Sequence, residues 1–411
     1  MLRSWRAAVA RLRALLRSDA VGVRAGFVAL LISSGGDLLA GLTLGAITDT
    51  LESLPGLLVL VPAAIGMRGN VFGALGSRLG TAIHTGTFRM SRRLDTVVGQ
   101  NLAASISLSL SISLVLAVLA KVISVGFGLA DTISIADFVV ISVIGGFLSS
   151  IVVLAITVAV AQLSTRRNWD LDNVSSPIVT AAGDMVTLPA LFLATYLAGL
   201  AWVTPIVALA CAVVGIGALL RSLRSRYPIL RRIARESVPV LVLAGTIDVI
   251  AGLTIEKRFE AFLVYPALLV LVPPFLEDSG ALGGILSARV STKLHLGTLD
   301  ARRWRLSAVA EDVMLIYLYA LPVFLLLGVT ADIASAVVGL ESPGALDMIA
   351  VSLLAGLVAT TCSVLVGFYS AVATYRLGLD PDNHAIPIVT SSLDLLGALS
   401  LILAIVALGL T

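Results

Sequence analysis

Charged side chains are scarce in this chain. Of its 411 residues only 13% are charged and 58% are hydrophobic, and the mean hydropathy is +1.04. This balance excludes a water-soluble globular protein, because most of the chain must lie in lipid. The polar segments between the apolar runs are too short for a nucleotide-binding or sensory domain, which argues against ATP-driven pumping by this chain alone. The sequence predicts an all-α polytopic membrane protein.

Cysteine is also rare, and concentrated positive charge and common catalytic motifs are missing. Cys211 and Cys362, the two cysteines, lie in apolar runs and form neither a metal-ligand spacing nor a disulfide framework. The net charge of +3 is spread over loops, which fits membrane topology better than nucleic acid binding. The chain has no His-Glu-x-x-His or Gly-x-Ser-x-Gly motif, so we expect no enzyme. An intramembrane enzyme or a scaffold is the weaker alternative.

The two halves of the chain repeat one another. Residues 37–87 align with residues 248–298 at a constant offset of 211, and 20 of the 51 positions are identical. Composition alone gives roughly one match in ten. A later segment repeats too, with Asp172, Asn173, Pro177, Thr180 and Asp184 returning as Asp382, Asn383, Pro387, Thr390 and Asp394. Matched intramembrane acids in a two-fold repeat are typical of a pathway between related halves.

Apolar runs long enough to cross a bilayer core of about 30 Å predict eleven transmembrane helices. We expect them near residues 22–47, 55–83, 99–127, 136–162, 174–199, 201–220, 238–256, 264–293, 307–331, 346–374 and 385–410. This gives a first five-helix repeat (22–199), a linking span with a basic segment (200–237) and a second repeat (238–411). The linking span lets both repeats enter the membrane in the same orientation, which predicts parallel repeats about a pseudo-two-fold axis.

The distribution of basic residues predicts the orientation in the membrane. With a cytoplasmic N-terminus, 22 of the 28 Lys and Arg residues fall in inner segments. We therefore expect a multi-pass cell-membrane protein with a cytoplasmic N-terminus and an extracellular C-terminus. Residues 1–21 alternate arginines with apolar residues, which is typical of an amphipathic helix on the membrane surface and lacks the features of a signal peptide.

Two aspartates are predicted to lie near the membrane midplane. Asp184 is roughly 15 Å from the cytoplasmic end of its span at 1.5 Å per residue, and Asp394 is its counterpart. A buried carboxylate must be paired, hydrated or metal-bound, and hard cations such as Mg²⁺ favour carboxylates and retained water. The structural alternative is a salt bridge from each aspartate to Arg68, Arg78 or Arg289.

A second matched pair, Asp37 and Asp248, begins the motif Asp-x-x-Ala-Gly-Leu-Thr in the first span of each half. These aspartates either line the pathway and bind a coupling ion, or satisfy backbone where helices approach closely at the following glycine. The next span of each half carries prolines, including Pro62 and Pro273, which predict a bent or broken helix.

This proline-containing span also carries a glycine face and an asymmetric charge. Gly66, Gly69, Gly73 and Gly76 leave one helix face as bare backbone, suited to tight packing or to passage of a hydrated ion. Asn70 lies in this face, whereas its counterpart is Ala281. Arg68 corresponds to Ser279, beside Glu277 and Asp278, which predicts an ion pair across the two halves or a one-sided metal site.

Each such span ends in Arg-x-x-Thr-x-x-His-x-Gly-Thr, from Arg78 and again from Arg289. Steps of three place the first three side chains along one helix stripe. The motif either gates the mouth of the pathway or caps the end of the helix, and its lone histidine gives no zinc-site spacing.

These motifs resemble the membrane domain of the MgtE and solute-carrier-41 families of magnesium transporters. The resemblance rests on Gly-Asn-x₇-Arg from Gly69, on Arg-Val-Ser-Thr-Lys-Leu-His-Leu-Gly from Arg289 and on residues 380–394, and it covers nearly the whole chain. It implies the tandem, single-chain form, in which the fifth-span aspartates Asp184 and Asp394 help bind hydrated Mg²⁺. It extends this role to Asn70, although Ala281 departs from the pattern. We expect no cytoplasmic Mg²⁺-sensing modules like those typical of the bacterial branch.

The sequence thus predicts a divalent cation transporter or channel, with Mg²⁺ as the transported substrate and no nucleic acid or obligate protein partner. The candidate metal residues are Asp184, Asp394, Asn70, Asp37 and Asp248. A Na⁺- or H⁺-coupled exchanger is the main alternative, and an organic-anion carrier is weaker because it would need unpaired midplane bases.

Overall fold

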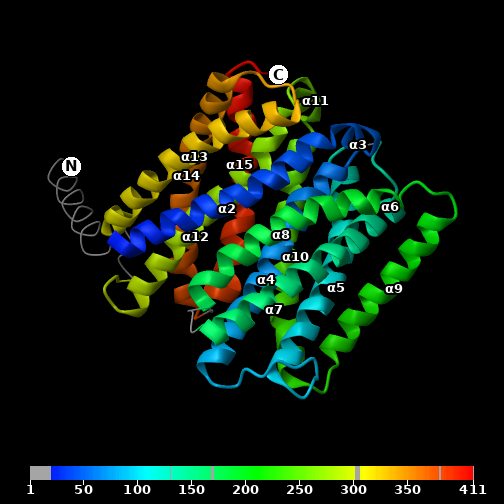
Figure 1. Ribbon diagram of the computed structural model, residues 1–411, viewed down its shortest axis with the longest axis vertical. Helices are drawn as coiled ribbons and strands as arrows, with labels where there is room; N and C mark the ends of the chain where they lie inside the picture. The colour runs from blue at the N-terminus through cyan, green and yellow to red at the C-terminus, as the bar shows by residue number, and fades with distance from the viewer. Residues whose placement is uncertain (1–19, 130, 168–170, 301–305, 379–380, 411) are drawn as a thin grey trace. The chain divides into compact units, whose positions relative to one another are not determined.

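The computed structural model describes residues 20–129, 131–167, 171–300, 306–378 and 381–410, and within these ranges it contains helices and no strands (Figure 1). Eleven of these described helices or helix pairs are long and apolar enough to cross a membrane, which confirms the predicted fold class and number of spans. The helices of the first half are α2 (Ala20–Ala46), α3 (Thr48–Ser53), α4 (Leu57–His84), α5 (Val97–Gly126), α6 (Ile135–Val140), η1 (Ile141–Gly145), α7 (Gly146–Arg167) and α8 (Leu171–Thr195). The linking helix is α9 (Val203–Leu223). The remaining helices are α10 (Pro228–Glu256), α11 (Phe259–Val264), α12 (Ala267–His295), η2 (Leu306–Val309), α13 (Ala310–Val338), α14 (Ala345–Leu377) and α15 (Pro381–Ala407).

The helices form two compact units. The first unit is Leu39–Phe259, and the second unit contains the described residues up to Leu38 together with those from Glu260 onward. In the first unit α4 packs against α5, α8 and α10, and in the second unit α12 packs against α13, α14 and α15. The second sequence repeat therefore gives its first span, α10, to the first unit, and the first repeat gives most of α2 to the second. The boundaries 22–199 and 238–411 describe the repeat in the sequence, which differs from the division into packed units, and they stay a prediction.

Helix α10 begins earlier than its hydropathy predicts. It starts at Pro228 rather than near residue 238, because Pro228 occupies the first helical turn, where its missing N–H costs nothing. The side-chain oxygen of Gln100 on α5 accepts from the backbone N–H of Ile229 at 3.1 Å. Arg232 bonds Glu236 one turn later, at 2.8 Å. Polar pairing therefore extends this helix beyond its apolar segment.

The prolines inside the two long helices do not break them, so that part of the expectation is wrong, while the bend stays a prediction. α4 continues from Leu57 to His84 through Pro62, and α12 continues through Pro273 and Pro274. Pro62 is near the start of α4, so it removes only one hydrogen bond, to the carbonyl of Leu58.

The two Arg-x-x-Thr-x-x-His-x-Gly-Thr motifs end their helices in the same way. Gly86 and Gly297 have left-handed φ values of 69° and 70°. Thr87 donates its N–H to the carbonyl of Ala82 at 2.9 Å, and Thr298 donates to Lys293 at 3.0 Å. This six-residue closure is the Schellman motif, so the capping interpretation is confirmed for the glycine and threonine of each motif.

The predicted amphipathic segment, residues 1–21, lies outside the described residues except for its last two, and α2 begins at Ala20.

Candidate functional site

A glycine face of α4 meets α8 in the first unit. A Cβ atom on Gly69 would lie 4.0 Å from Cγ2 of Thr180, and one on Gly183 would lie 3.5 Å from Cβ of Arg68. The residue numbers rise on one helix as they fall on the other, so the helices run antiparallel. Asp184 follows Gly183 directly and is completely buried. The small residues thus bring the backbone of α4 close to the segment of α8 that carries the aspartate.

The second unit repeats this helix pair. A Cβ atom on Gly280 of α12 would lie 3.6 Å from the Cα atom of Thr390 on α15. Thr390 is four residues before Asp394, as Thr180 is four residues before Asp184, and Asp394 is 7% exposed. The sequence repeat is therefore a repeat of packing, in which each unit places an aspartate beside a glycine face.

One position on each glycine face borders open space. Apart from the two chain neighbours and the backbone of the same helix, no described atom lies within 4 Å of the position that a Cβ atom would take at Gly73 or at Gly284. These two glycines match at the offset of 211 and lie one helical turn beyond Gly69 and Gly280. The glycine face therefore serves helix packing at one position and leaves open space at the next. Tight packing alone does not account for the whole face, and neither does an open path for a hydrated ion.

The predicted metal residues are distributed over both units. Asn70, Asp184 and Asp248 belong to the first unit, and Asp37 and Asp394 belong to the second. All four aspartates are buried, whereas Asn70 is half-buried on the glycine face of α4. Among the described residues no three His, Cys, Asp or Glu side chains gather closely enough to hold a metal ion.

Close helix packing is confirmed beside Asp248. A Cβ atom on Gly252, four residues later, would lie 2.5 Å from the carbonyl oxygen of Val59 and 2.8 Å from that of Leu58. The Leu58 carbonyl is the one that Pro62 deprives of its helical partner. The glycine of the Asp-x-x-Ala-Gly motif therefore lets α10 approach the backbone of α4, while the role of the aspartate as an ion ligand stays a prediction.

Arg68 is a buried base that neutral groups hold. It is 1% exposed, and it donates to Ser149 at 3.0 Å, to the carbonyl of Ala64 at 2.8 Å and to Ser113 at 3.3 Å. Gly146 makes room for the guanidinium group, because a side chain there would collide with it. The predicted ion pair between Arg68 and the acids of the other half stays a prediction.

The other two arginines also bond residues other than the midplane aspartates. In the first unit Arg78 donates from Nε to Asn101 at 2.8 Å, and in the second unit Arg289 donates from Nε to Asp312 at 2.8 Å. The structural alternative, a salt bridge from Asp184 or Asp394 to one of these arginines, stays a prediction. The bonds of Asp312 were not anticipated, although Asn101 and Asp312 differ by the same 211.

The second unit adds charges that the first lacks. Lys293 bonds Asp312 at 2.5 Å and Glu311 at 2.9 Å, and the corresponding residues of the first half are Ala82, Asn101 and Gln100. An ionic cluster in one unit thus replaces a neutral amide contact in the other. The arrangement supplies matched buried carboxylates on closely packed helices, which can bind a cation that retains water, together with an electrostatic difference between the halves.

Comparisons with known proteins agree with these features. A family model described as MgtE, divalent cation transporter, matches residues 61–194 and 272–404. Solute carrier family 41 member 3 of Rattus norvegicus is 25% identical over 398 residues, which cover 90% of this chain and 84% of that protein. Solute carrier family 41 member 2 of Xenopus laevis is 28% identical over 404 residues, 90% of this chain and 69% of that protein. No solved structure matches.

Proposed function

Because the chain belongs to the MgtE family of divalent cation transporters, we propose that it carries Mg²⁺ across the membrane as its principal substrate. The observation that carries the proposal is the packing shared by both units, in which a buried aspartate follows the threonine that meets a glycine face. Carboxylate and amide oxygens suit a hard cation, and Mg²⁺ gives up its water reluctantly. A buried carboxylate of this kind therefore suits an ion that travels largely hydrated.

In this proposal Asp184 and Asp394 supply the negative charge that offsets the cost of moving a divalent ion into the membrane. Their carboxylates accept hydrogen bonds from the water shell of the ion, and Asn70 contributes a further oxygen from the first unit alone. Gly73 and Gly284 leave the space beside the helices that a hydrated ion needs. The N-terminus is cytoplasmic and the C-terminus extracellular, as the arginine-rich inner segments favour.

Asp37 and Asp248 favour a second mode of the same function. They are buried, match in sequence, and lie inside the first span of each half. Acids inside spans are typical of ion and proton relays. If they bind Na⁺ or H⁺, the protein exchanges that ion for Mg²⁺, and if they serve packing alone, Mg²⁺ follows its own electrochemical gradient.

The test is Mg²⁺ uptake into proteoliposomes that contain a Mg²⁺-sensitive dye, with protein-free vesicles as the control. We expect uptake only with protein, and uptake equal to that of the empty vesicles would refute the proposal. Opposed gradients of Na⁺ or of pH are then imposed at a clamped membrane potential. A rate that follows the imposed gradient identifies an exchanger, and an unchanged rate identifies a channel.

A further inference from the structure

A basic cavity lies at the turn between α9 and α10 in the first unit, and none of the residues assigned to cation transport lines it. It has a volume of about 510 Å³ and is lined by Arg221, Arg224 and Arg226, together with apolar residues that include Leu94 and Leu220. All three arginines are exposed, and none of the described residues that line the cavity is acidic. Its charge therefore calls for an anionic ligand.

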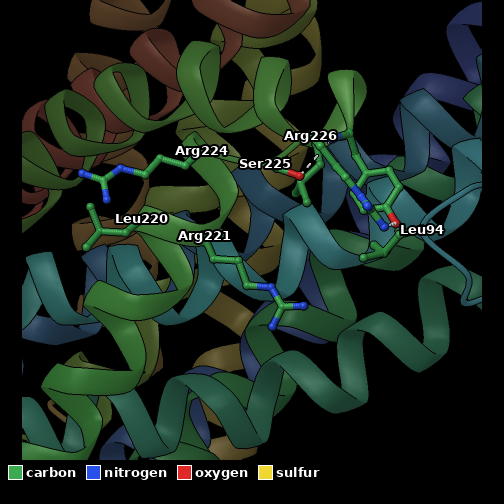
Figure 2. A pocket seen from close by; sticks show the side chains of 8 residues that line it. Leu94, Leu220, Arg221, Arg224, Ser225 and Arg226 are labelled. Atoms are coloured by element: carbon green, nitrogen blue, oxygen red, sulfur yellow. Dashed lines mark hydrogen bonds between the residues drawn. The ribbon is translucent and has the colours of Figure 1, made fainter.

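The guanidinium groups cover a broad area instead of meeting at one point. Figure 2 shows Arg221 and Arg224 extending from the turn in different directions, while Arg226 lies back toward Leu94. Arg226 is held against the ring of Tyr227, with its carbon Cζ 5.1 Å from the ring centre and a hydrogen bond of 3.1 Å to the hydroxyl group. An isolated phosphate ion needs converging donors, so this spread suits a headgroup at the membrane surface that carries further polar atoms beside its phosphate.

The turn itself is held in place. The side chain of Ser225 accepts from the N–H of Tyr227 at 3.1 Å, and the side-chain oxygen of Gln100 on α5 accepts from the N–H of Ile229. The arginines therefore project from an ordered segment, which lowers the entropy lost when a ligand binds.

An exposed aliphatic stripe leads away from this cavity along α9, which lies beside α5 at the edge of the first unit (Figure 1). Ile206, Leu209, Val213, Ile216 and Leu220 follow one another at steps of three and four residues, and each is between 43% and 67% exposed. Such steps place them on one helix face. From Leu209 to Leu220 the stripe is roughly 16 Å long at 1.5 Å per residue, about half of a bilayer core of 30 Å.

We propose that this cavity and stripe bind an anionic phospholipid, with its headgroup at Arg221 and Arg224 and an acyl chain along α9. Guanidinium groups bond phosphate oxygens in pairs, and the apolar stripe ends at Leu220 in the wall of the cavity. The continuity of charge and apolar surface selects an amphipathic ligand over a soluble phosphate. Basic clusters at the ends of transmembrane helices commonly bind such headgroups.

The experiment measures binding of phosphatidylglycerol and of phosphatidylcholine to the detergent-purified full chain by native mass spectrometry. Phosphatidylglycerol should bind more tightly, and Arg221→Gln with Arg224→Gln should weaken its binding roughly tenfold or more, since charge-assisted bonds to phosphate are lost. Arg89→Gln with Arg92→Gln removes the same charge from the segment between α4 and α5, at exposed residues that do not line the cavity. This control pair should change binding by less than about twofold.

Equal losses in the two pairs would assign the effect to general surface charge and overturn the proposal. Displacement of the lipid by inorganic phosphate would assign the cavity to a soluble anion and overturn it too. If the glutamine pair fails to insert, Arg221→Lys with Arg224→Lys keeps the charge that sets topology but cannot bond phosphate in pairs. This pair should still weaken phosphatidylglycerol binding, and unchanged binding would contradict the proposal. The readout is independent of transport, so neither result depends on the proposed function.

Discussion

Asp312 is the residue whose neutralisation should most destabilise the second unit. Its side chain is fully buried and accepts hydrogen bonds from Arg289 at 2.8 Å and Lys293 at 2.5 Å. Loss of one partner from a buried ion pair costs about 3–5 kcal/mol. The side chains of Arg289 and Lys293 are 28% and 27% exposed, so water solvates them in part and the cost of Asp312→Asn should be near the lower value, about 3 kcal/mol. At ~2–4 °C per kcal/mol this lowers the unfolding midpoint by roughly 6–12 °C.

The assay is thermal unfolding in detergent, followed by the reaction of a thiol-reactive dye. Cys362 lies half-buried on α14 in the same unit as Asp312. In a Cys211→Ser background it is the single thiol in the chain, so the dye reports on the second unit.

The first unit provides the matched control. Its counterparts of Asp312 and Lys293 are Asn101 and Ala82, so Asp312→Asn combined with Lys293→Ala copies a pair that the chain already uses. Removing the unmatched cation should restore more than half of the lost stability, because the two positions are coupled. A combined variant as unstable as Asp312→Asn, or no destabilisation by Asp312→Asn, would refute the reasoning.

Two further predictions concern glycines. Gly252→Ala should cost about 1–3 kcal/mol of unfolding free energy and so lower the unfolding midpoint, because its methyl group would lie 2.5 Å from the carbonyl oxygen of Val59. Gly217→Ala, whose methyl group would enter open space among the described residues, should stabilise α9 slightly. Both glycines belong to the first unit, so the reporting thiol is Cys211 on α9 in a Cys362→Ser background, and equal effects of the two substitutions on its dye reaction would contradict the packing of α10 on α4. Gly73→Leu with Gly284→Leu should reduce Mg²⁺ uptake about tenfold or more while leaving the midpoint nearly unchanged, because the added side chains enter open space. Full uptake by this variant would remove the glycine face from the ion path.

The matched residues were the most predictable part of the structure. The offset between the halves pairs Asp184 with Asp394, and both are buried on equivalent helices, α8 and α15. Hydropathy also predicts the number of spans, since each apolar run is long enough to cross a bilayer. Hydropathy and the internal repeat are properties of each half of the sequence by itself. They therefore predict these features without knowledge of how the helices pack.

Features that depend on the choice of partner were not predictable in this way. The pattern of α10 is the same whichever half it joins, so nothing in it indicates that Gly252 packs against Leu58 and Val59 of the first unit. Hydropathy predicts the start of α10 ten residues too late, because it ignores the hydrogen bond that the N–H of Ile229 donates to Gln100. The contacts of Arg68 with serines depend on tertiary packing alone. The contacts of Arg78 with Asn101 and of Arg289 with Asp312 could have been suggested by extending the sequence repeat to Asn101.

The most direct test of the central claim is Mg²⁺ uptake by Asp184→Asn with Asp394→Asn, at equal reconstitution with the native protein. The exposed loop residue Asp131 supplies the control, Asp131→Asn, which loses one carboxylate outside the spans. The account predicts that the double variant stays folded and loses uptake by about tenfold or more, since the carboxylates no longer offset the cost of a buried divalent ion, while the control transports normally. Native uptake by a folded double variant would contradict the assignment of these two aspartates as the ion site.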